Sequence, residues 1–374
     1  MGTLNPRMSI DPGLFEENEK HQRGAQQGQA AQLGSFELES GGRLESVQAA
    51  YHLYGSLDQP VILVCHAISG DSNAAAWWDR LIGPGKALDT DRFALLCSNA
   101  LGGCRGTTGP SSAAPDGMPY GSRFPKITMG DIVDVQYRLA QHLGIKQFAL
   151  AAGGSMGGMQ ALEWSRRHPE MIERVWVTAS ALHHSAMQIG FNEAARQAIL
   201  RDPKWNGGDY SADDPPVQGL AIARMMGHLT YLSEAAFEQK FGRRQQSQRR
   251  EVVGFSVPQL PDYAAFEPFQ VESYLQYQGE KFTQRFDAGS FVALSNAIDR
   301  YDCDSLSSAK AKFLVTSFTS DWIYPSHQSA AIAALARSAG LPAAHAEIDL
   351  PYGHDAFLLD DLHQADLVRE FLRS

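Results

Sequence analysis

The stretch FALAAGGSMGGMQAL, residues 148–162, decides the fold class of this chain. An apolar run typical of a buried strand leads through Gly153-Gly154-Ser155-Met156-Gly157 directly into a helical pattern. This order predicts a nucleophile elbow, a tight turn that exposes a serine hydroxyl at the end of a strand. Glycine is needed at 153 and 157, because side chains there would collide with neighbouring backbone, and Ser155 must adopt a strained φ/ψ. The same pattern occurs by chance in loops of glycine-rich chains, but the strand before it and the helix after it favour the elbow.

Similar short apolar runs recur on both sides of this stretch and alternate with helical patterns. Runs of this length suit strands that are buried on both faces of a parallel sheet. The runs cover residues 61–64, 93–97, 175–178, 313–316 and 346–350, and the helical patterns cover 132–143, 159–167, 328–339 and 362–372. Residues 35–39 and 48–54 flank Gly41-Gly42 and predict an antiparallel hairpin that opens the sheet. The alternation predicts an α/β fold with a mostly parallel sheet flanked by helices.

One interval breaks this alternation and predicts an insertion. Between residues 183 and 305 no buried-strand pattern occurs, and amphipathic helical pieces take its place at 186–200, 219–226, 233–241 and 272–282. We therefore expect a helical lid at 183–305 between two parts of one core, 34–182 and 306–374. Residues 1–33 are polar and rich in Gln and Gly, and we expect them to form a flexible N-terminal arm.

The composition excludes several classes of protein. Of 374 residues, 44% are hydrophobic and 20% charged, which is typical of a folded protein. The net charge of −10 disfavours nucleic acid or an anionic membrane as the main partner, although a small anionic ligand responds to its local pocket. Four cysteines without a CxxC pair argue against a zinc site or a disulfide scaffold. No signal peptide or membrane span is recognisable, so we expect a cytoplasmic protein.

A serine nucleophile needs a base, and the base needs a carboxylate to orient it. In folds with this elbow the chain order is Ser, Asp or Glu, then His, each after a later strand. Asp321 follows the run at 313–316, and His354 follows the last apolar run, so we expect both beside Ser155. Rival residues lie in the lid or before the strand: His183, His184, His228, Asp299, Asp302 and Asp304.

The developing oxyanion needs two backbone N–H groups aimed at it. We expect one from Met156, the residue after the nucleophile, and the other from Ile68 in the loop after the first buried run. His66 lies in the same loop, but its position fits a structural role better than that of the base.

Five strings, one of them within residues 148–162, resemble the homoserine O-acyltransferases of methionine biosynthesis, and the resemblance runs from about residue 34 to the C-terminus. They are LGGCRGTTGPSS at 101–112, GGSMGGMQ at 153–160, FNE with RQAI at 191–199, ARMMGHLTYLS at 223–233 and VESYL at 271–275. The resemblance implies an α/β-hydrolase core with a helical lid, a homodimer formed through the lid helices, and no metal or bound cofactor. It also implies acyl transfer from acyl-CoA to an amino-acid hydroxyl through an acyl-serine.

The resemblance makes Ser155, Asp321 and His354 the catalytic triad. It further implies that Arg224 holds the substrate carboxylate and that Asp355 holds its amino group. A zwitterionic substrate does need one cation and one anion in an apolar site, and guanidinium binds carboxylate bidentately. Without the resemblance, Arg224 reads more simply as a solvated residue on an amphipathic helix.

The acyl donor is expected to be acetyl-CoA, with L-homoserine as the acceptor. Family members that use succinyl-CoA tend to carry arginine two residues after the triad aspartate, where this chain has Ile323. An aliphatic side chain leaves a buried succinyl carboxylate without a partner. A serine O-succinyltransferase branch, which tends to have Asn at the position of Gly154, fits worse. An esterase or thioesterase of the same fold stays an alternative, because the triad alone does not choose between water and an alcohol.

Two segments depart from the family pattern, residues 242–269 and the early loop 70–77. Both could lie at the entrance to the active site. Because CoA is anionic, cations should gather there, and the candidates are Arg105, Arg224 and the stretch 243–250.

Overall fold

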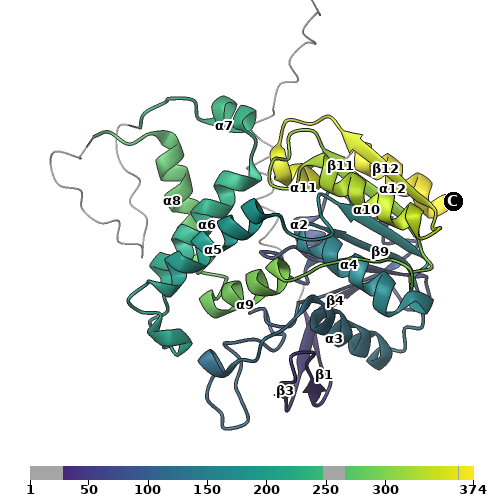
Figure 1. The fold of residues 1–374 in the computed structure, drawn as a ribbon, viewed down its shortest axis with the longest axis horizontal. Coiled ribbons are helices and arrows are strands. Elements are labelled where there is room, and N and C mark those ends of the chain that lie inside the picture. The colour runs from purple at the N-terminus through teal and green to yellow at the C-terminus, as the bar shows by residue number, and fades with distance from the viewer. Residues whose placement is uncertain (1–27, 247–265, 361) are drawn as a thin grey trace, which may run out of the picture.

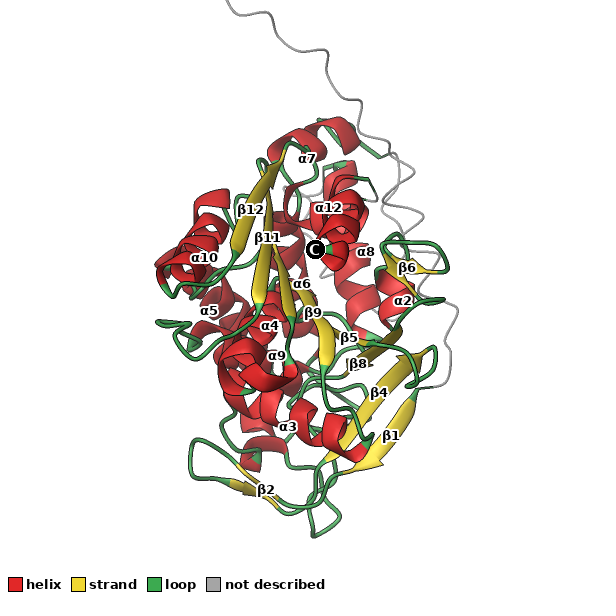
Figure 2. Cartoon of the chain, turned by 90° about the vertical axis from the view of Figure 1, so that its right-hand side faces the viewer, coloured by secondary structure: helices red, strands yellow, loops and turns green. Residues whose placement is uncertain are grey.

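The computed structural model describes residues 28–246, 266–360 and 362–374, and its centre is a mostly parallel sheet. In the described part the strands follow the order β1-β4-β8-β5-β9-β10-β11-β12, and Figure 2 shows them fanning across the molecule. Pairing is antiparallel for β1 with β4 and for β4 with β8, and parallel from β8 to β12. The bounds are β1 Gln29–Gln32, β4 Gln48–Tyr54, β5 Val61–Cys65, β8 Ala94–Ser98, β9 Phe148–Gly154, β10 Arg174–Thr178, β11 Lys312–Phe318 and β12 Ala343–Ile348. The predicted α/β class is confirmed.

The continuous apolar runs form strands because both faces of the sheet are covered. Successive side chains of β5 enter different cores: Leu63 packs with one buried cluster, and Ile62 and Val64 pack with the other. The first cluster includes residues of α3 (Met129–His142), α4 (Met156–Arg167) and α10 (Ser326–Ser338). The second includes residues of α11 (Ala356–Leu359) and α12 (His363–Arg373), with α2 (Ala74–Trp77) beside them.

The N-terminal expectations need correction. The predicted hairpin is split: β2 (Phe36–Glu37) pairs with β3 (Arg43–Leu44) in a ribbon of its own, and β4 pairs with β1 in the main sheet. Residues 29–32, assigned to the flexible arm from their polar composition, form this edge strand. An edge strand needs few apolar residues, and here Ala31 is buried while its neighbours are exposed. The rest of the predicted arm, residues 1–27, lies outside the described residues.

Helices fill the chain between β10 and β11. They are α5 (Ala186–Leu200), α6 (Val217–Tyr231), α7 (Glu234–Lys240), α8 (Gln270–Thr283) and α9 (Ala288–Asp299), and α6 packs against both α5 and α8 (Figure 1). We refer to α5–α9 as the lid. Helix α9 was not predicted, because most of its residues are buried and it lacks the one-sided pattern of an amphipathic helix. Most of the segment that departs from the family pattern, residues 247–265, lies outside the described residues.

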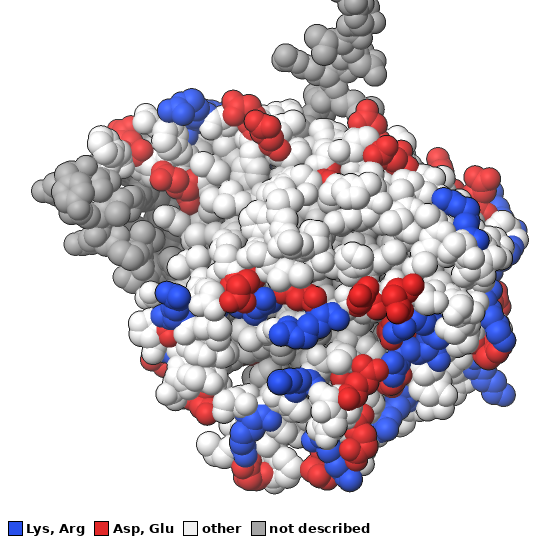
Figure 3. Space-filling view, viewed as in Figure 1, with Lys and Arg blue, Asp and Glu red and all other residues white. Residues whose placement is uncertain are grey.

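Short elements complete the described chain. They are β6 (Ile82–Gly83), β7 (Leu88–Asp89) and the 3-10 turns η1 (Gly121–Arg123), η2 (Pro169–Met171), η3 (Asn206–Gly208) and η5 (Gly353–Asp355). Among the described residues no helix combines the length and the apolar character needed to cross a membrane. On the face drawn in Figure 3, acidic and basic side chains are interspersed, so the net negative charge is not gathered into a single acidic field there.

Candidate active site

Ser155 lies at the sharp turn between β9 and α4. Its φ of 55° and ψ of −126° are the strained values that the glycine pattern predicts. A Cβ at Gly153 would lie 2.2 Å from the carbonyl oxygen of Gly157, and a Cβ at Gly157 would lie 2.1 Å from that of Cys65. Both glycines are therefore required by close backbone contact. The turn is held by a hydrogen bond that the Ser180 hydroxyl donates to the Ser155 carbonyl at 2.8 Å.

His354 and Asp321 form a buried pair. Nδ1 of His354 lies 2.7 Å from Oδ2 of Asp321, and the side chains are 4% and 0% exposed. The other carboxylate oxygen accepts the backbone N–H groups of Ile323 at 3.1 Å and Tyr324 at 2.8 Å, so the carboxylate cannot rotate freely. A carboxylate only accepts hydrogen bonds, so Nδ1 carries the proton and Nε2 of the neutral ring is left as a base.

Ser155 and His354 line one cavity of about 70 Å³, which we call the inner cavity. Ile68, Arg224 and Ile323 line it too, so five of the predicted site residues meet there. This volume is several times the ~10–15 Å³ that a cavity needs to hold one water molecule. The inner cavity therefore has room for a small group beside the serine.

The two predicted oxyanion donors come from neighbouring segments. Met156 begins α4, and its N–H is one of the first donors of a helix, which have no acceptor within that helix. Ile68 follows β5, and the start of α4 packs directly on the end of that strand through Gly157 and Cys65. His66 does not face the serine as a base: its Nε2 accepts the N–H of Ala100 at 3.0 Å, and its Nδ1 contacts the Ala67 carbonyl at 2.7 Å.

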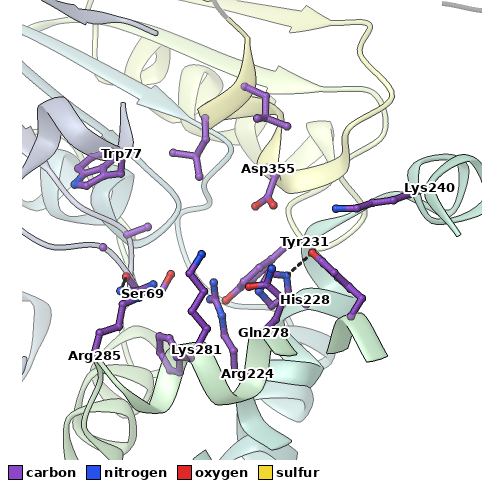
Figure 4. A pocket seen from close by; sticks show the side chains of 16 residues that line it. Ser69, Trp77, Arg224, His228, Tyr231, Lys240, Gln278, Lys281, Arg285 and Asp355 are labelled. Atoms are coloured by element: carbon purple, nitrogen blue, oxygen red, sulfur yellow. Dashed lines mark hydrogen bonds between the residues drawn. The ribbon is translucent and has the colours of Figure 1, made fainter. Parts of the chain in front are cut away.

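Arg224 and Asp355 face each other across a second hollow, the outer cavity of about 150 Å³ (Figure 4). Arg224 comes from α6 and lines both cavities, and its guanidinium lies 4.7 Å from the centre of the Phe282 ring. Asp355 directly follows His354 on the core side. Burial raises the pKa of Asp355 to about 6, although the charges of His354, Arg224 and Lys240 act in the opposite direction. The outer cavity thus contains Asp355 and a cation, Arg224, that also lines the inner cavity.

Comparison with known proteins shows the family to which this chain belongs. A family model described as the alpha/beta hydrolase fold matches residues 60–361. A homoserine O-acetyltransferase of Solidesulfovibrio magneticus is 46% identical over 359 residues, which cover 90% of this chain and 88% of that protein. A homoserine O-acetyltransferase of Leptospira biflexa is 42% identical, over 93% of this chain and 94% of that protein. The chain belongs to the homoserine O-acetyltransferase family.

Solved structures agree on the fold of this family member. A homoserine O-acetyltransferase from Bacillus anthracis superposes with a TM-score of 0.83 at 28% identity, covering 93% of this chain and 98% of that one. A structure of esterase E22 superposes with a TM-score of 0.82 at 27% identity, covering 92% and 99%. Transferases and esterases therefore share this architecture.

Several cations of this homoserine O-acetyltransferase family member were missed by sequence reasoning. Lys240, Lys281 and Arg285 line the outer cavity together with Arg224 (Figure 4). Burial and the nearby charge of Arg224 lower the pKa of Arg285 to about 10. The spacing of Lys281 and Arg285, four residues apart near the end of a helical pattern, was the signal that could have found them.

The other predicted cations are divided between two places. Arg105 lines a neighbouring cavity that Arg285 also lines. The guanidinium of Arg105 lies 3.5 Å from a carboxylate oxygen of Asp71. Arg243 and Arg244 are exposed and line none of the cavities described here. Residues 247–250 of this basic stretch lie outside the described residues.

The rival histidines and aspartates have other partners. His183 is exposed and lies 3.4 Å from Asp302, and His228 makes a hydrogen bond with Tyr274 at 3.2 Å. His184 is paired with Asp299 at 2.8 Å. Within the described ranges, no three His, Cys, Asp or Glu side chains gather in a way that could hold a metal ion.

Proposed function

We propose that this chain is a homoserine O-acetyltransferase that moves acetyl from acetyl-CoA to the hydroxyl of L-homoserine in methionine biosynthesis. The observation that carries the proposal is the position of Arg224 and Asp355: both line the outer cavity, and Arg224 also lines the cavity of Ser155 and His354. A zwitterionic amino acid held by both ends would present its hydroxyl inward. Membership of the homoserine O-acetyltransferase family points to the same substrate.

The first half of the proposed reaction acetylates Ser155. His354, oriented by Asp321, takes the hydroxyl proton of Ser155 while Oγ attacks the thioester carbonyl. The N–H groups of Ile68 and Met156 stabilise the oxyanion. The C–S bond then breaks, His354 returns the proton to the departing thiolate, and free CoA leaves an acetyl-serine.

The second half transfers the acetyl group to homoserine. His354 takes the proton of the homoserine hydroxyl, whose oxygen attacks the acetyl carbonyl, and the same two N–H groups stabilise the oxyanion. The bond between the carbonyl carbon and Oγ then breaks, and Ser155 recovers its proton from His354. In this proposal no metal or bound cofactor takes part, and acetyl-CoA is a co-substrate.

The inner cavity supports acetyl as the transferred group. Ile323 lines it and is 7% exposed, so its wall is aliphatic at that position and offers no partner to a succinyl carboxylate there. Arg224 also lines this cavity, but in this proposal it holds the carboxylate of homoserine. The cations of the outer cavity, Arg224, Lys240, Lys281 and Arg285, support an anionic donor such as CoA.

We also propose a homodimer formed through the lid helices. Apolar side chains are exposed on α5 at Met187, Ile189 and Leu200, and on α6 at Ile222 and Leu229. Sedimentation of the purified chain at several concentrations measures this directly. Both proposed substrates are cytoplasmic metabolites, so we propose the cytoplasm as the compartment.

An esterase is the second candidate, because esterase E22 has a similar fold. A single assay that follows O-acetylhomoserine formation and acetyl-CoA hydrolysis separates the two, with succinyl-CoA tested in parallel as donor. We expect acetylation of homoserine to dominate, and no acetyl transfer by Ser155→Ala. Hydrolysis that dominates at saturating homoserine would favour the esterase, and undiminished transfer by Ser155→Ala would end the acyl-serine mechanism.

A further inference from the structure

Tyr324 contacts two residues of the proposed triad and shares a cavity with the third. Its backbone N–H donates to Oδ1 of Asp321 at 2.8 Å. Its ring stacks on the imidazole of His354, with ring centres 5.0 Å apart and planes 23° apart. Its side chain and that of Ser155 line the same inner cavity. The residue is 6% exposed and lines the inner cavity, so these contacts are shielded from bulk water.

The hydroxyl of Tyr324 is itself anchored by a histidine and an aspartate of the lid region. Oη lies 2.6 Å from Nε2 of His184, and Nδ1 of His184 lies 2.8 Å from Oδ1 of Asp299. Asp299 also accepts a hydrogen bond from Arg196 at 2.6 Å and one from Asn192 at 2.7 Å. Four hydrogen bonds thus lock a buried chain of groups that ends at Tyr324, whose ring lies on the imidazole of His354.

The direction of these hydrogen bonds follows from which groups donate. Asp299 only accepts, so Nδ1 of His184 donates to it, and in the neutral ring Nε2 is left as an acceptor. The hydroxyl of Tyr324 therefore donates to His184. Burial raises the pKa of Tyr324, so the phenol keeps its proton.

We propose that Tyr324 is a positioning residue for the triad, and that Asp299 and His184 hold it in place. The fixed ring keeps the imidazole plane of His354 aligned with the hydroxyl of Ser155. His184 precedes α5 and Asp299 ends α9, so the chain also ties the alignment of the triad to the seating of the lid on the core. This inference rests on the proposed roles of Ser155 and His354, but not on the identity of the acyl acceptor.

The test follows acetylation of Ser155 by p-nitrophenyl acetate, as the burst of nitrophenol in stopped-flow. Tyr324→Phe keeps the ring and the backbone N–H and removes only the hydroxyl. His184→Leu removes the anchor of that hydroxyl. We expect each change to slow the burst by about 10-fold with the half-saturating ester concentration changed by less than ~2-fold, because misalignment affects the reacting atoms more than binding. The double variant should be no slower than either single variant, since both break one chain.

Two further variants separate positioning from a structural role. In His184→Gln the side-chain amide can donate to Asp299 and accept from Tyr324, so most of the burst rate should return. His183→Leu is the matched control, since His183 is the exposed neighbour, with its side chain 64% exposed, and its burst should equal that of the unaltered chain.

Each outcome of these assays decides the proposal. An unchanged burst in Tyr324→Phe and His184→Leu would overturn it. A lower unfolding temperature with an unchanged burst would also overturn it, because the chain of groups would then be only a link between lid and core. The ester assay needs no homoserine, so a chain that shows the expected pattern and does not acetylate homoserine would contradict the proposed function and leave this inference supported.

Discussion

The carbonyl oxygen of Cys65 lies only 2.1 Å from the point where a Cβ on Gly157 would be. The first turn of α4 is therefore packed against the end of β5, with backbone touching backbone. This contact brings the segment of Met156 next to the segment of Ile68, the two proposed donors to the oxyanion. The geometry of the proposed oxyanion site therefore requires that residue 157 has no side chain.

Gly157→Ala is expected to lower kcat by about 100-fold, because a shift of about 1 Å at the reacting atoms has an effect of that size. The new methyl group would meet backbone and force the start of α4 away from β5. Steady-state acetyl transfer measures the effect. Gly190→Ala is the control, because Gly190 is exposed on α5 and its Cβ would meet nothing within 4 Å. Full activity in Gly157→Ala would contradict the proposed oxyanion site.

Asp321→Asn is expected to lower kcat by about 10⁴-fold, the effect of losing the carboxylate that selects the histidine tautomer. The amide can donate to Nδ1 of His354, and the ring would then present a proton to Ser155 where a base is needed. The burst with p-nitrophenyl acetate measures the loss at the acylation step. Asp302→Asn serves as the comparison, since Asp302 is 70% exposed and should tolerate the change. If Asp321→Asn lowers the activity by less than tenfold, another residue supplies the carboxylate that orients His354.

Arg224→Lys is expected to raise KM for homoserine by about 10- to 100-fold, the range for losing a charge-assisted hydrogen bond at a bidentate site. Lysine keeps the charge but not the planar fork that grips a carboxylate. Acetylation of Ser155 by p-nitrophenyl acetate should change little, because the ester has no carboxylate. Arg300→Lys, on the exposed end of the lid, is the matched control. An unchanged KM for homoserine in Arg224→Lys would mean that Arg224 does not bind the substrate carboxylate.

The ionisation of Asp355 should appear in the pH dependence of KM for homoserine. Burial raises its pKa to about 6. Only the ionised carboxylate attracts the substrate ammonium, so KM should fall as the pH rises through about 6 and level off above it. Steady-state assays between pH 5 and pH 8 measure the curve. Asp355→Asn should have a high KM with no such step, and a step that survives in this variant would belong to another group.

The same carboxyl contributes to the pH dependence of stability. Its pKa is higher in the folded chain than the ordinary 3.8, so the folded state binds the proton more tightly than the unfolded state. The free energy of unfolding should therefore decrease as the pH rises from about 4 to about 6, and this contribution should be constant above that window. Asp355→Asn should flatten this part of the curve in denaturant titrations.

Ile323→Ala is expected to widen the range of acyl donors. The side chain is buried in the wall of the inner cavity, and its removal would make room for one more methylene. The ratio of kcat/KM for propionyl-CoA to that for acetyl-CoA should rise by about 10-fold, within the range for one methylene in an apolar pocket. An unchanged ratio would mean that the acyl group lies against another wall.

Each part of the site that could be predicted from the sequence is defined by a short segment of its own. The elbow needs glycines at 153 and 157, and the buried runs before Asp321 and His354 place both at strand ends. The edge strand at 29–32 could not be predicted, because its polar residues face solvent and its pairing with β4 is decided by the sheet. Helix α9 was missed for the opposite reason, since burial on most sides removes the helical period from the apolar pattern.

The sequence by itself determined the α/β class, the strained serine turn and the order of serine, aspartate and histidine. These are local properties, because strand, turn and helix preferences act over a few neighbouring residues. Only the tertiary structure decided which cations line the outer cavity and that Tyr324 contacts both His354 and Asp321. His184 and Asp299, 115 residues apart, meet behind that tyrosine only because the lid folds back on the core. Contacts across such a separation depend on packing, and no local pattern records them.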